Sequence, residues 1–163
     1  MIRISRDELV RRLSGVATQL FIDDLDPIST HCLVSSAAEN ASLLAKEAAG
    51  SNFNDHILAT FSQKELKDIQ KLRNQYWTPI KHSRDKAGVP FDFSSIFEGF
   101  SDQINDHSLF IVWHDYLLAG FPIPLEAQVF QVWYYGLYPE KLSEDEGFWC
   151  LKNSLALCLI KQE

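Results

Sequence analysis

The sequence predicts an all-α fold, arranged as a single compact bundle of about six to seven helices. Almost every segment repeats its apolar residues with a period near 3.6, and a clean two-residue alternation is absent. Glycine and proline punctuate these segments where helices would end, as at Gly50 and at Gly120 with Pro122. The 163 residues are 46% hydrophobic, which is enough to bury a core without disulfides or metals. We therefore expect one domain over residues 1–163.

Composition and charge limit the classes of protein that fit. Cys32, Cys150 and Cys158 form no Cys-x-x-Cys pair, so reduced thiols are expected, with neither a disulfide framework nor a zinc site. The net charge of −7 disfavours a surface that grips nucleic acid throughout, although a local basic patch is compatible with it. No apolar run approaches about 20 residues, and the charged start of the chain does not resemble a secretory signal. We expect a cytoplasmic protein with no membrane association and no cofactor.

A helix is predicted from about Arg6 to Ile22, because Ser5 and Glu8 have the spacing of an N-terminal capping box. Apolar residues follow at intervals of three and four, which places them on one stripe. This stripe is expected to face the core. It comprises Leu9, Leu13, Val16 and Leu20, with Val10, Ala17 and Phe21 beside it.

The second helix is predicted to begin with Asp26 as N-cap and Pro27 at the first helical position, and to end at Gly50. Its many Ala and Ser residues would let a neighbouring helix come close. At 100° per residue one arc of this helix is apolar and a narrow stripe beside it is polar. The apolar arc holds Val34, Ala37, Ala41, Leu44, Ala45 and Ala48, and the polar stripe holds His31, Ser35, Glu39 and Ser42.

The middle of the chain is predicted to be helical but interrupted. Residues 51–61 form a short helix or turn, and Ser62 with Glu65 has the capping-box spacing that starts another helix. Pro79 must break or kink that helix, because proline lacks the amide proton and clashes with the preceding turn. Residues 91–100 are a short, aromatic-rich helical piece. The interrupted helix carries Leu66, Ile69, Leu72, Tyr76 and Trp77 at helical spacing.

Three further helices are predicted in the last third. Residues 109–118 are apolar on nearly all sides, which is typical of a central helix. Pro124 opens the next helix and Pro139 stops it, and Ser143 with Glu146 forms another capping-box pattern. Val129, Phe130, Trp133 and Leu137 are expected to face one way on the first of these two, and Phe148, Leu151, Leu155, Cys158 and Leu159 to line the last helix.

The segment from Arg73 to Asp85 is the densest in chemistry. Arg73 falls inside the apolar arc of its helix, where an uncompensated charge would cost about 3–5 kcal/mol. It is therefore either a structural ion pair, with Glu39 or Asp115 as candidate partners, or part of an anion site. A continuous helix would place four polar residues on one stripe. These are Asn74, Thr78, Lys81 and Asp85.

Two histidines are candidates for chemistry. Lys81 and His82, next to the proline, present a cation and a titratable imidazole that would suit a phosphate, or else form a solvated turn. His31 with Glu39 two turns on would suit acid–base work or metal binding, although a histidine at the edge of the core is the commoner outcome. His114 with Asp115 fits a satisfied buried pair better than a catalytic dyad.

Familiar catalytic signatures are missing: there is no glycine-rich phosphate loop, no Gly-x-Ser-x-Gly elbow and no dinucleotide fingerprint. The aromatic residues 133–138 lack interleaved Lys or Arg, so they fit a core or an interaction surface better than a stack of bases.

Three stretches, DDLDPISTHCLVSSAAENASLLAKEA, LRNQYWTPIKHSRD and EAQVFQVWYYGLYPE, together resemble a group of uncharacterised bacterial helical proteins with an Asn-aromatic-aromatic-Lys-His-Ala-Asp-Arg-Asp segment. More distantly, the chain is similar to the HEPN superfamily, whose active members are ribonucleases with an arginine and a histidine that four to six residues separate. Here eight residues separate Arg73 from His82, and Thr78-Pro79-Ile80 widens the gap before Lys81. The positions that match the first group are Asp26, Pro27, His31, Glu39, Asn74, Lys81, His82 and Asp85.

Two functions follow as hypotheses, and the sequence leaves open whether the protein is an enzyme. The first is an interaction or regulatory module without catalytic activity, which would meet a second copy or another protein through its aromatic C-terminal half. The second, implied by the HEPN resemblance, is a domain that binds nucleotide or RNA phosphate, with ribonuclease activity that needs no metal. In that scheme His82 is the catalytic acid–base, and the binding residues are His31, Glu39, Arg73, Asn74, Lys81 and Asp85.

Overall fold

The computed structural model describes residues 3–60, 67, 71 and 74–139. Across these residues there are seven helices and no strand, so the prediction of an all-α fold is confirmed. No helix among them is long and apolar enough to span a membrane. Contacts within the chain divide it into two units, residues 1–123 and 124–163. The prediction of one domain stays a prediction.

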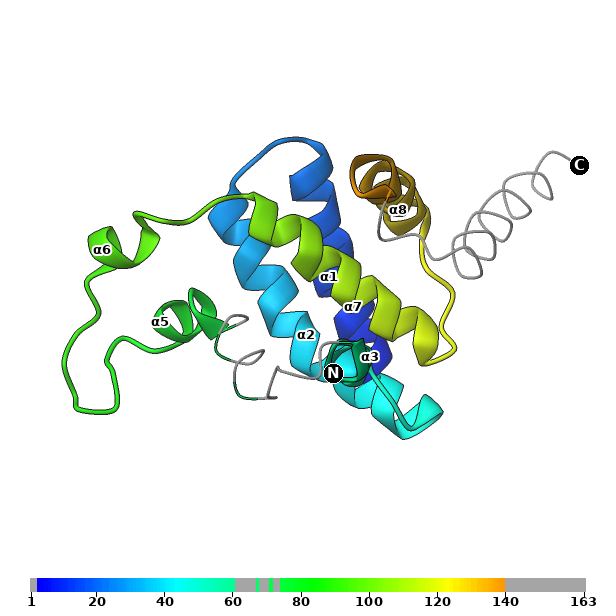
Figure 1. Ribbon diagram of the computed structural model, residues 1–163, viewed down its shortest axis with the longest axis horizontal. Coiled ribbons are helices and arrows are strands. Elements are labelled where there is room, and N and C mark those ends of the chain that lie inside the picture. Colours follow the sequence, from blue (N-terminus) through cyan, green and yellow to red (C-terminus); the bar gives the residue numbers. More distant parts are fainter. Residues whose placement is uncertain (1–2, 61–66, 68–70, 72–73, 140–163) are drawn as a thin grey trace, which may run out of the picture. The chain divides into compact units, whose positions relative to one another are not determined.

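Three long helices build the core of the first unit: α1 (Arg6–Ile22), α2 (Pro27–Ala49) and α7 (Gln103–Leu118). Helix α2 packs against both α1 and α7, and α1 also contacts α7 (Figure 1). Small side chains dominate the buried face of α2, which lets its neighbours approach closely. The fully or almost fully buried apolar residues of the three helices are Val10, Ala17, Val34, Ala37, Ala41, Ala45, Leu109, Val112 and Trp113.

Helix α1 has the predicted bounds but not the predicted cap, and only part of the predicted stripe, including Val10 and Ala17, is buried. The Ser5 side chain makes no capping hydrogen bond, and the Glu8 carboxylate instead accepts from Arg12 Nε at 3.1 Å. Leu9 and Val16, which were expected to face the core, are exposed. The helix is rotated because the small residues on its next face fit against α2 and α7. Its buried residues are Val10, Ser14, Ala17 and Thr18.

A buried polar contact joins α1 to α7. Trp113 Nε1 donates to Thr18 Oγ1 at 2.9 Å, and that hydroxyl donates to the Ser14 carbonyl at 2.7 Å. The indole nitrogen is therefore satisfied inside the core. The Ser14 hydroxyl itself is buried, and it has no hydrogen-bond partner among the described residues.

The caps of α2 are confirmed. The Asp26 carboxylate accepts from the backbone amides of Ile28 and Ser29 at 3.1 and 3.3 Å, and from the Ser29 hydroxyl. The hydrogen bond from the Ser29 side chain is the main cause that holds the pKa of Asp26 below its ordinary value, and burial opposes it. At the other end Gly50 has φ 74°, the left-handed conformation that ends helices and that glycine adopts without strain.

Helices α2 and α7 run parallel. Near the start of both, Asn105 Nδ2 donates to the Pro27 carbonyl at 2.9 Å. Just beyond the end of α2, the Phe53 amide donates to Asp115 Oδ1, in the last turn of α7, at 2.7 Å. Parallel neighbours need a long crossover, because the chain must return along the full length of the first helix. Residues 50–102 form that crossover.

The crossover carries three short helices: α3 (Phe53–Thr60), α5 (Trp77–Lys81) and α6 (Phe93–Phe97). Pro79 lies in the first turn of α5, where a missing amide proton costs nothing. Helix α5 spans Trp77–Lys81, so Asn74, Thr78, Lys81 and Asp85 do not share the stripe that a continuous helix would have given them. The helix expected to start at Ser62 with Glu65 lies outside the described residues.

Aromatic rings hold the crossover's second half together. Tyr76 stacks on Phe97 with ring centroids 5.7 Å apart and meets Phe100 edge-on at 5.1 Å. Its hydroxyl donates to the Gly99 carbonyl at 3.0 Å. Tyr76 is nearly fully buried, so this cluster anchors the segment that leads into α5.

In the second unit, α8 (Leu125–Leu137) begins after Pro124 and ends before Pro139, as predicted. Three of the four residues expected to face one way, Val129, Trp133 and Leu137, share an exposed face, but the fourth, Phe130, does not. Phe130 is buried together with Ala127 and Tyr134, whereas Val129 and Trp133 are exposed. Both sides of this helix carry apolar residues at helical spacing. The spacing alone therefore could not show which side is buried. The last predicted helix, with Ser143 and Glu146, lies outside the described residues.

Candidate functional site

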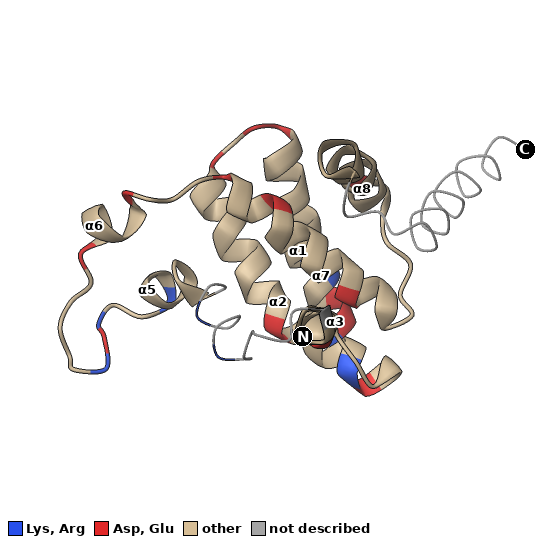
Figure 2. Ribbon diagram, viewed as in Figure 1, with Lys and Arg blue, Asp and Glu red and all other residues tan. Residues whose placement is uncertain are grey.

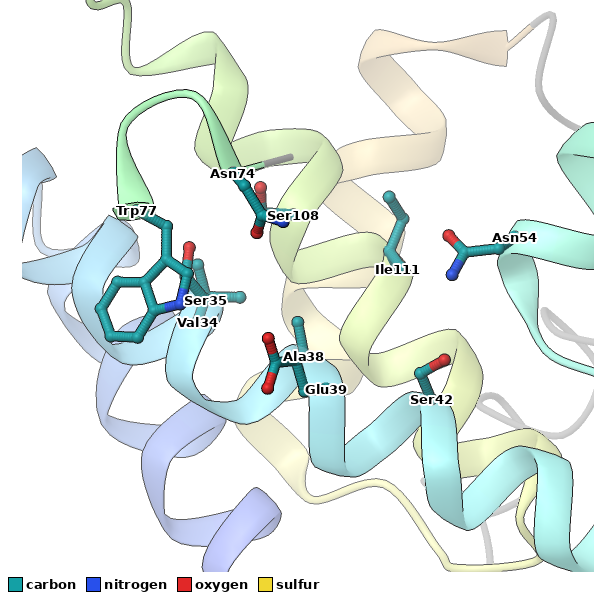
Figure 3. Close-up of a pocket in the computed structure, with 10 residues that line it drawn as sticks. All are labelled: Val34, Ser35, Ala38, Glu39, Ser42, Asn54, Asn74, Trp77, Ser108 and Ile111. Atoms are coloured by element: carbon teal, nitrogen blue, oxygen red, sulfur yellow. The ribbon is translucent and has the colours of Figure 1, made fainter. Parts of the chain in front are cut away.

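A cavity of about 300 Å³ opens in the first unit, between α2 and the crossover segments that return past it. Residues from α2, α3, α7 and the start of α5 line it (Figure 3). We call it the Glu39 cavity. Its lining comprises Val34, Ser35, Ala38, Glu39, Ser42, Asn54, Asn74, Trp77, Ser108 and Ile111.

Among the described residues of that lining, Glu39 is the one with an ionisable side chain. Its carboxylate makes no hydrogen bond or ion pair with the residues that the structure describes, and the side chain is exposed. In Figure 3 it points from α2 into the cavity on the side of Trp77 and Asn74, whereas Asn54 and Ser42 lie on the other side. The cavity therefore presents one uncompensated negative charge beside an indole ring.

All three serine hydroxyls of the lining already have a hydrogen-bond partner, which for Ser35 is His31. Ser42 Oγ accepts from Asn52 Nδ2 at 2.7 Å, and Ser108 Oγ donates to the Ile104 carbonyl at 2.8 Å. Ser108 keeps lone pairs that can accept a hydrogen bond, and Ser42 keeps a proton that it can donate. The cavity walls can thus form several neutral hydrogen bonds around the carboxylate.

His31 lies behind the cavity wall, in the core. Its Nδ1 is 3.1 Å from Asn105 Oδ1, and its Nε2 is 3.4 Å from Ser35 Oγ, which belongs to the lining. Asn105 Nδ2 donates to both the Pro27 carbonyl and Asp102 Oδ1, so its oxygen is the acceptor for histidine. His31 Nδ1 therefore carries the proton.

The surroundings of His31 favour the neutral imidazole. Its side chain is 1% exposed, and the rings of Tyr76 and Phe100 meet it edge-on, with centroids 6.0 and 5.7 Å away. Burial lowers the pKa of His31 below its ordinary value, and the hydrogen bond with Asn105 opposes that shift in part. Both ring nitrogens are engaged, so His31 reaches the cavity only through Ser35.

The structure brings together some of the predicted site residues. Glu39 and Asn74 line the same cavity, and His31 adjoins it through one hydroxyl. Lys81 and His82 are exposed, at the end of α5 and just after it, and are not part of the lining. Arg73 lies outside the described residues.

Asp85 has a structural role in the turn after α5. Its carboxylate accepts from the amides of Ala87 and Val89 at 2.9 and 2.8 Å. The Arg84 guanidinium donates to the Gly88 carbonyl at 2.8 Å in the same turn. Figure 2 shows that the loop between α5 and α6 carries both signs of charge.

Asp115, one candidate partner of Arg73, is almost fully buried and accepts from the Phe53 amide at the start of α3. His114 Nδ1 lies 3.4 Å from the same carboxylate oxygen. The Asp115 carboxylate therefore has a structural role at the start of α3. This fits the expectation that His114 and Asp115 are a hydrogen-bonded pair and not a catalytic dyad.

Sequence reasoning missed Trp77, Asn54 and Ser108 as lining residues. Trp77 fell on an apolar stripe, and an indole repeats with the same period whether it faces a core or a cavity. Asn54 and Ser108 carry no pattern that marks them. Asn105, which fixes the tautomer of His31, was also missed, because its partners His31 and Pro27 lie 74 and 78 residues away in sequence.

A second feature, on α8, is an exposed apolar face. Its members recur at helical spacing and are each between 42% and 66% exposed. No Lys or Arg occurs on this helix, and Glu126 is its one acidic residue. We call this set of residues the α8 face. It comprises Leu125, Val129, Val132, Trp133 and Leu137.

No protein-family model, no curated protein and no solved structure matches this chain. The likeness to HEPN proteins and to the bacterial helical group therefore stays a prediction.

Proposed function

We propose that this protein is an interaction module without catalytic activity, and that it associates with a second copy of itself through the α8 face. The observation that carries the proposal is the exposure of five large apolar side chains on one side of a single helix. An apolar patch of this kind on a protein surface commonly marks an interaction site.

The spacing of the α8 face supports helix-to-helix docking. From Leu125, its members follow at four, seven, eight and twelve positions, so they form one continuous stripe along more than three turns. Full burial of a side chain such as Val or Leu contributes about 1.5–3 kcal/mol. A few of these contacts would offset the loss of translational and rotational freedom on association, which costs about 4–15 kcal/mol.

The net charge of the chain does not prevent a second copy from occupying this face. The chain carries a net charge of −7, so two copies repel each other over most of their surfaces. The α8 face has no charged member, so repulsion is weaker there, and Glu126 is the one carboxylate of this helix. A two-fold axis through this face would pack the same stripe against itself, which is the commonest symmetry of homodimers.

Sedimentation velocity over a dilution series tests the proposal. We expect the wild-type chain to pass from dimer to monomer as it is diluted. Val132→Glu should make it monomeric throughout, since two-fold symmetry would bring two new carboxylates to one interface. Val16→Glu, the same change at an exposed valine of α1, is the matched control and should leave association unchanged. A wild-type monomer at every concentration, or a Val132→Glu chain that still dimerises, would refute the proposal.

A second candidate function is the binding of nucleotide or RNA phosphate at the turn after α5. It is supported by four exposed residues that can carry positive charge, namely Lys81, His82, Arg84 and Lys86. Fluorescence anisotropy with a labelled single-stranded RNA tests it. Lys81→Ala and His82→Ala should each weaken binding, and either unchanged affinity in both variants or no binding by the wild type would contradict it.

A further inference from the structure

We propose that the Glu39 cavity binds a small organic cation that carries N–H groups, either a primary ammonium or a guanidinium, on a short aliphatic chain. This site is separate from the α8 face and does not depend on self-association. Four properties of the lining lead to this class of ligand: charge, hydrogen-bonding groups, an aromatic face and size.

The charge of the cavity comes from Glu39. None of the described residues that line the cavity is Lys, Arg or His, and the carboxylate makes no ion pair or hydrogen bond with any residue that the structure describes. A phosphate or carboxylate ligand would meet a like charge there, whereas a cation would complete a charge-assisted pair. The net charge of −7 also raises the local concentration of cations around the chain.

Neutral oxygen atoms surround that carboxylate. Ser35 and Ser108 offer hydroxyl lone pairs, and Asn74 offers an amide oxygen. An ammonium group has three donors and a guanidinium has five, and each donor needs an acceptor once it leaves water. A quaternary ammonium has no N–H donor and would leave these acceptors unused, so the lining favours a cation with N–H groups.

Trp77 supplies the aromatic face. Its indole is half-buried, and it flanks the cavity on the side to which the Glu39 carboxylate points (Figure 3). Cations bind over the face of tryptophan more favourably than over other aromatic rings. A cation held between a carboxylate and an indole is attracted by both.

Size and apolar walls complete the description. The volume of about 300 Å³ is at the lower end of the roughly 300–1,000 Å³ that is common for small-molecule sites. Val34, Ala38 and Ile111 form the apolar part of the lining, which suits a few methylene groups. A short alkyl chain with one cationic end matches both parts of the cavity.

Isothermal titration calorimetry with n-butylamine and n-butylguanidine on the full chain tests this inference, with 1-butanol as the uncharged counterpart and glucose as a neutral polar ligand. We expect both cations to bind one site and the two neutral compounds to bind at least about tenfold more weakly, since a hydrogen bond to a charged group is worth a factor of this size. Raising the salt concentration should weaken the binding of the two cations but not that of the neutral compounds.

Matched variants locate the site. Glu39→Gln preserves the shape of the side chain at an exposed position. We expect this variant to bind both cations at least about tenfold more weakly. Trp77→Leu should also weaken them, and Glu98→Gln, an exposed carboxylate outside the cavity, should not. The inference is overturned if neither cation binds, if Glu39→Gln binds them as well as the wild type does, or if 1-butanol or glucose binds as tightly as the cations.

Discussion

Replacing Asn105 with alanine should reveal how much stability its buried hydrogen bonds provide. The change leaves the Nδ1–H of His31 without an acceptor and removes a donor from the Pro27 carbonyl. A buried group left without a partner costs about 1–3 kcal/mol. The Pro27 carbonyl is only partly buried, so the unpaired Nδ1–H of His31 accounts for most of the lost stability. We expect a loss of about 2–4 kcal/mol, which is a large share of the roughly 5–15 kcal/mol of a typical domain.

Urea unfolding followed by tryptophan fluorescence at pH 8 measures this loss. Asn40→Ala is the control, because Asn40 lies on α2 and makes no hydrogen bond with the described residues. It should change the free energy of unfolding by less than about 0.5 kcal/mol. A loss below about 1 kcal/mol for Asn105→Ala, or one equal to the control, would refute the assigned network.

Asn105→Asp separates the histidine contact from the rest of the network. Aspartate keeps an acceptor for His31 but adds a negative charge beside it, which favours the protonated imidazole. The variant should therefore lose less stability at pH 6 than at pH 8. An equal loss at both values would mean that the carboxylate does not interact with His31.

Three further predictions follow from single residues. Ser14→Ala should raise the free energy of unfolding by about 1 kcal/mol in a urea titration, because the Ser14 hydroxyl is buried without a partner. Gly50→Ala should lower the thermal midpoint by the equivalent of about 1 kcal/mol, because φ is 74° there. Burial makes the pKa of His31 lower in the folded chain than its ordinary 6.5, so the unfolded chain binds the proton first and stability should fall as pH falls through and below 6.5. His31→Gln should flatten that part of the pH profile, whereas His82→Gln, at an exposed position, should not.

Local signals in the sequence were the ones that predicted structure well. Asp26, Pro27 and Gly50 act within a few residues of themselves, so the two ends of α2 could be placed from the sequence. The buried face of α1 could not, because Leu9 and Val10 are adjacent and equally apolar. Which of them faces inward depends on α2 and α7, which lie far away in sequence.

The same limit applies to the candidate site. Glu39 and Asn74 were both expected to bind a ligand, and the cavity unites them, but their meeting depends on how the crossover returns. Lys81 and His82 were expected beside them because they follow Asn74 closely within one short segment that is kinked at Pro79. Helix α5 ends at Lys81, so the sequence spacing no longer corresponds to a spacing along one helical face.

The parallel packing of α2 and α7 also has an electrostatic consequence. Adjacent parallel helices align their macrodipoles, so the positive ends of both meet at one end of the pair. Asp26 precedes α2 and Asp102 precedes α7, which places a carboxylate at each positive end. The lowered pKa of Asp26 keeps its charge in mild acid. Protonation in stronger acid would remove the compensation from two helices at the same place, so this end of the bundle is where acid unfolding should begin.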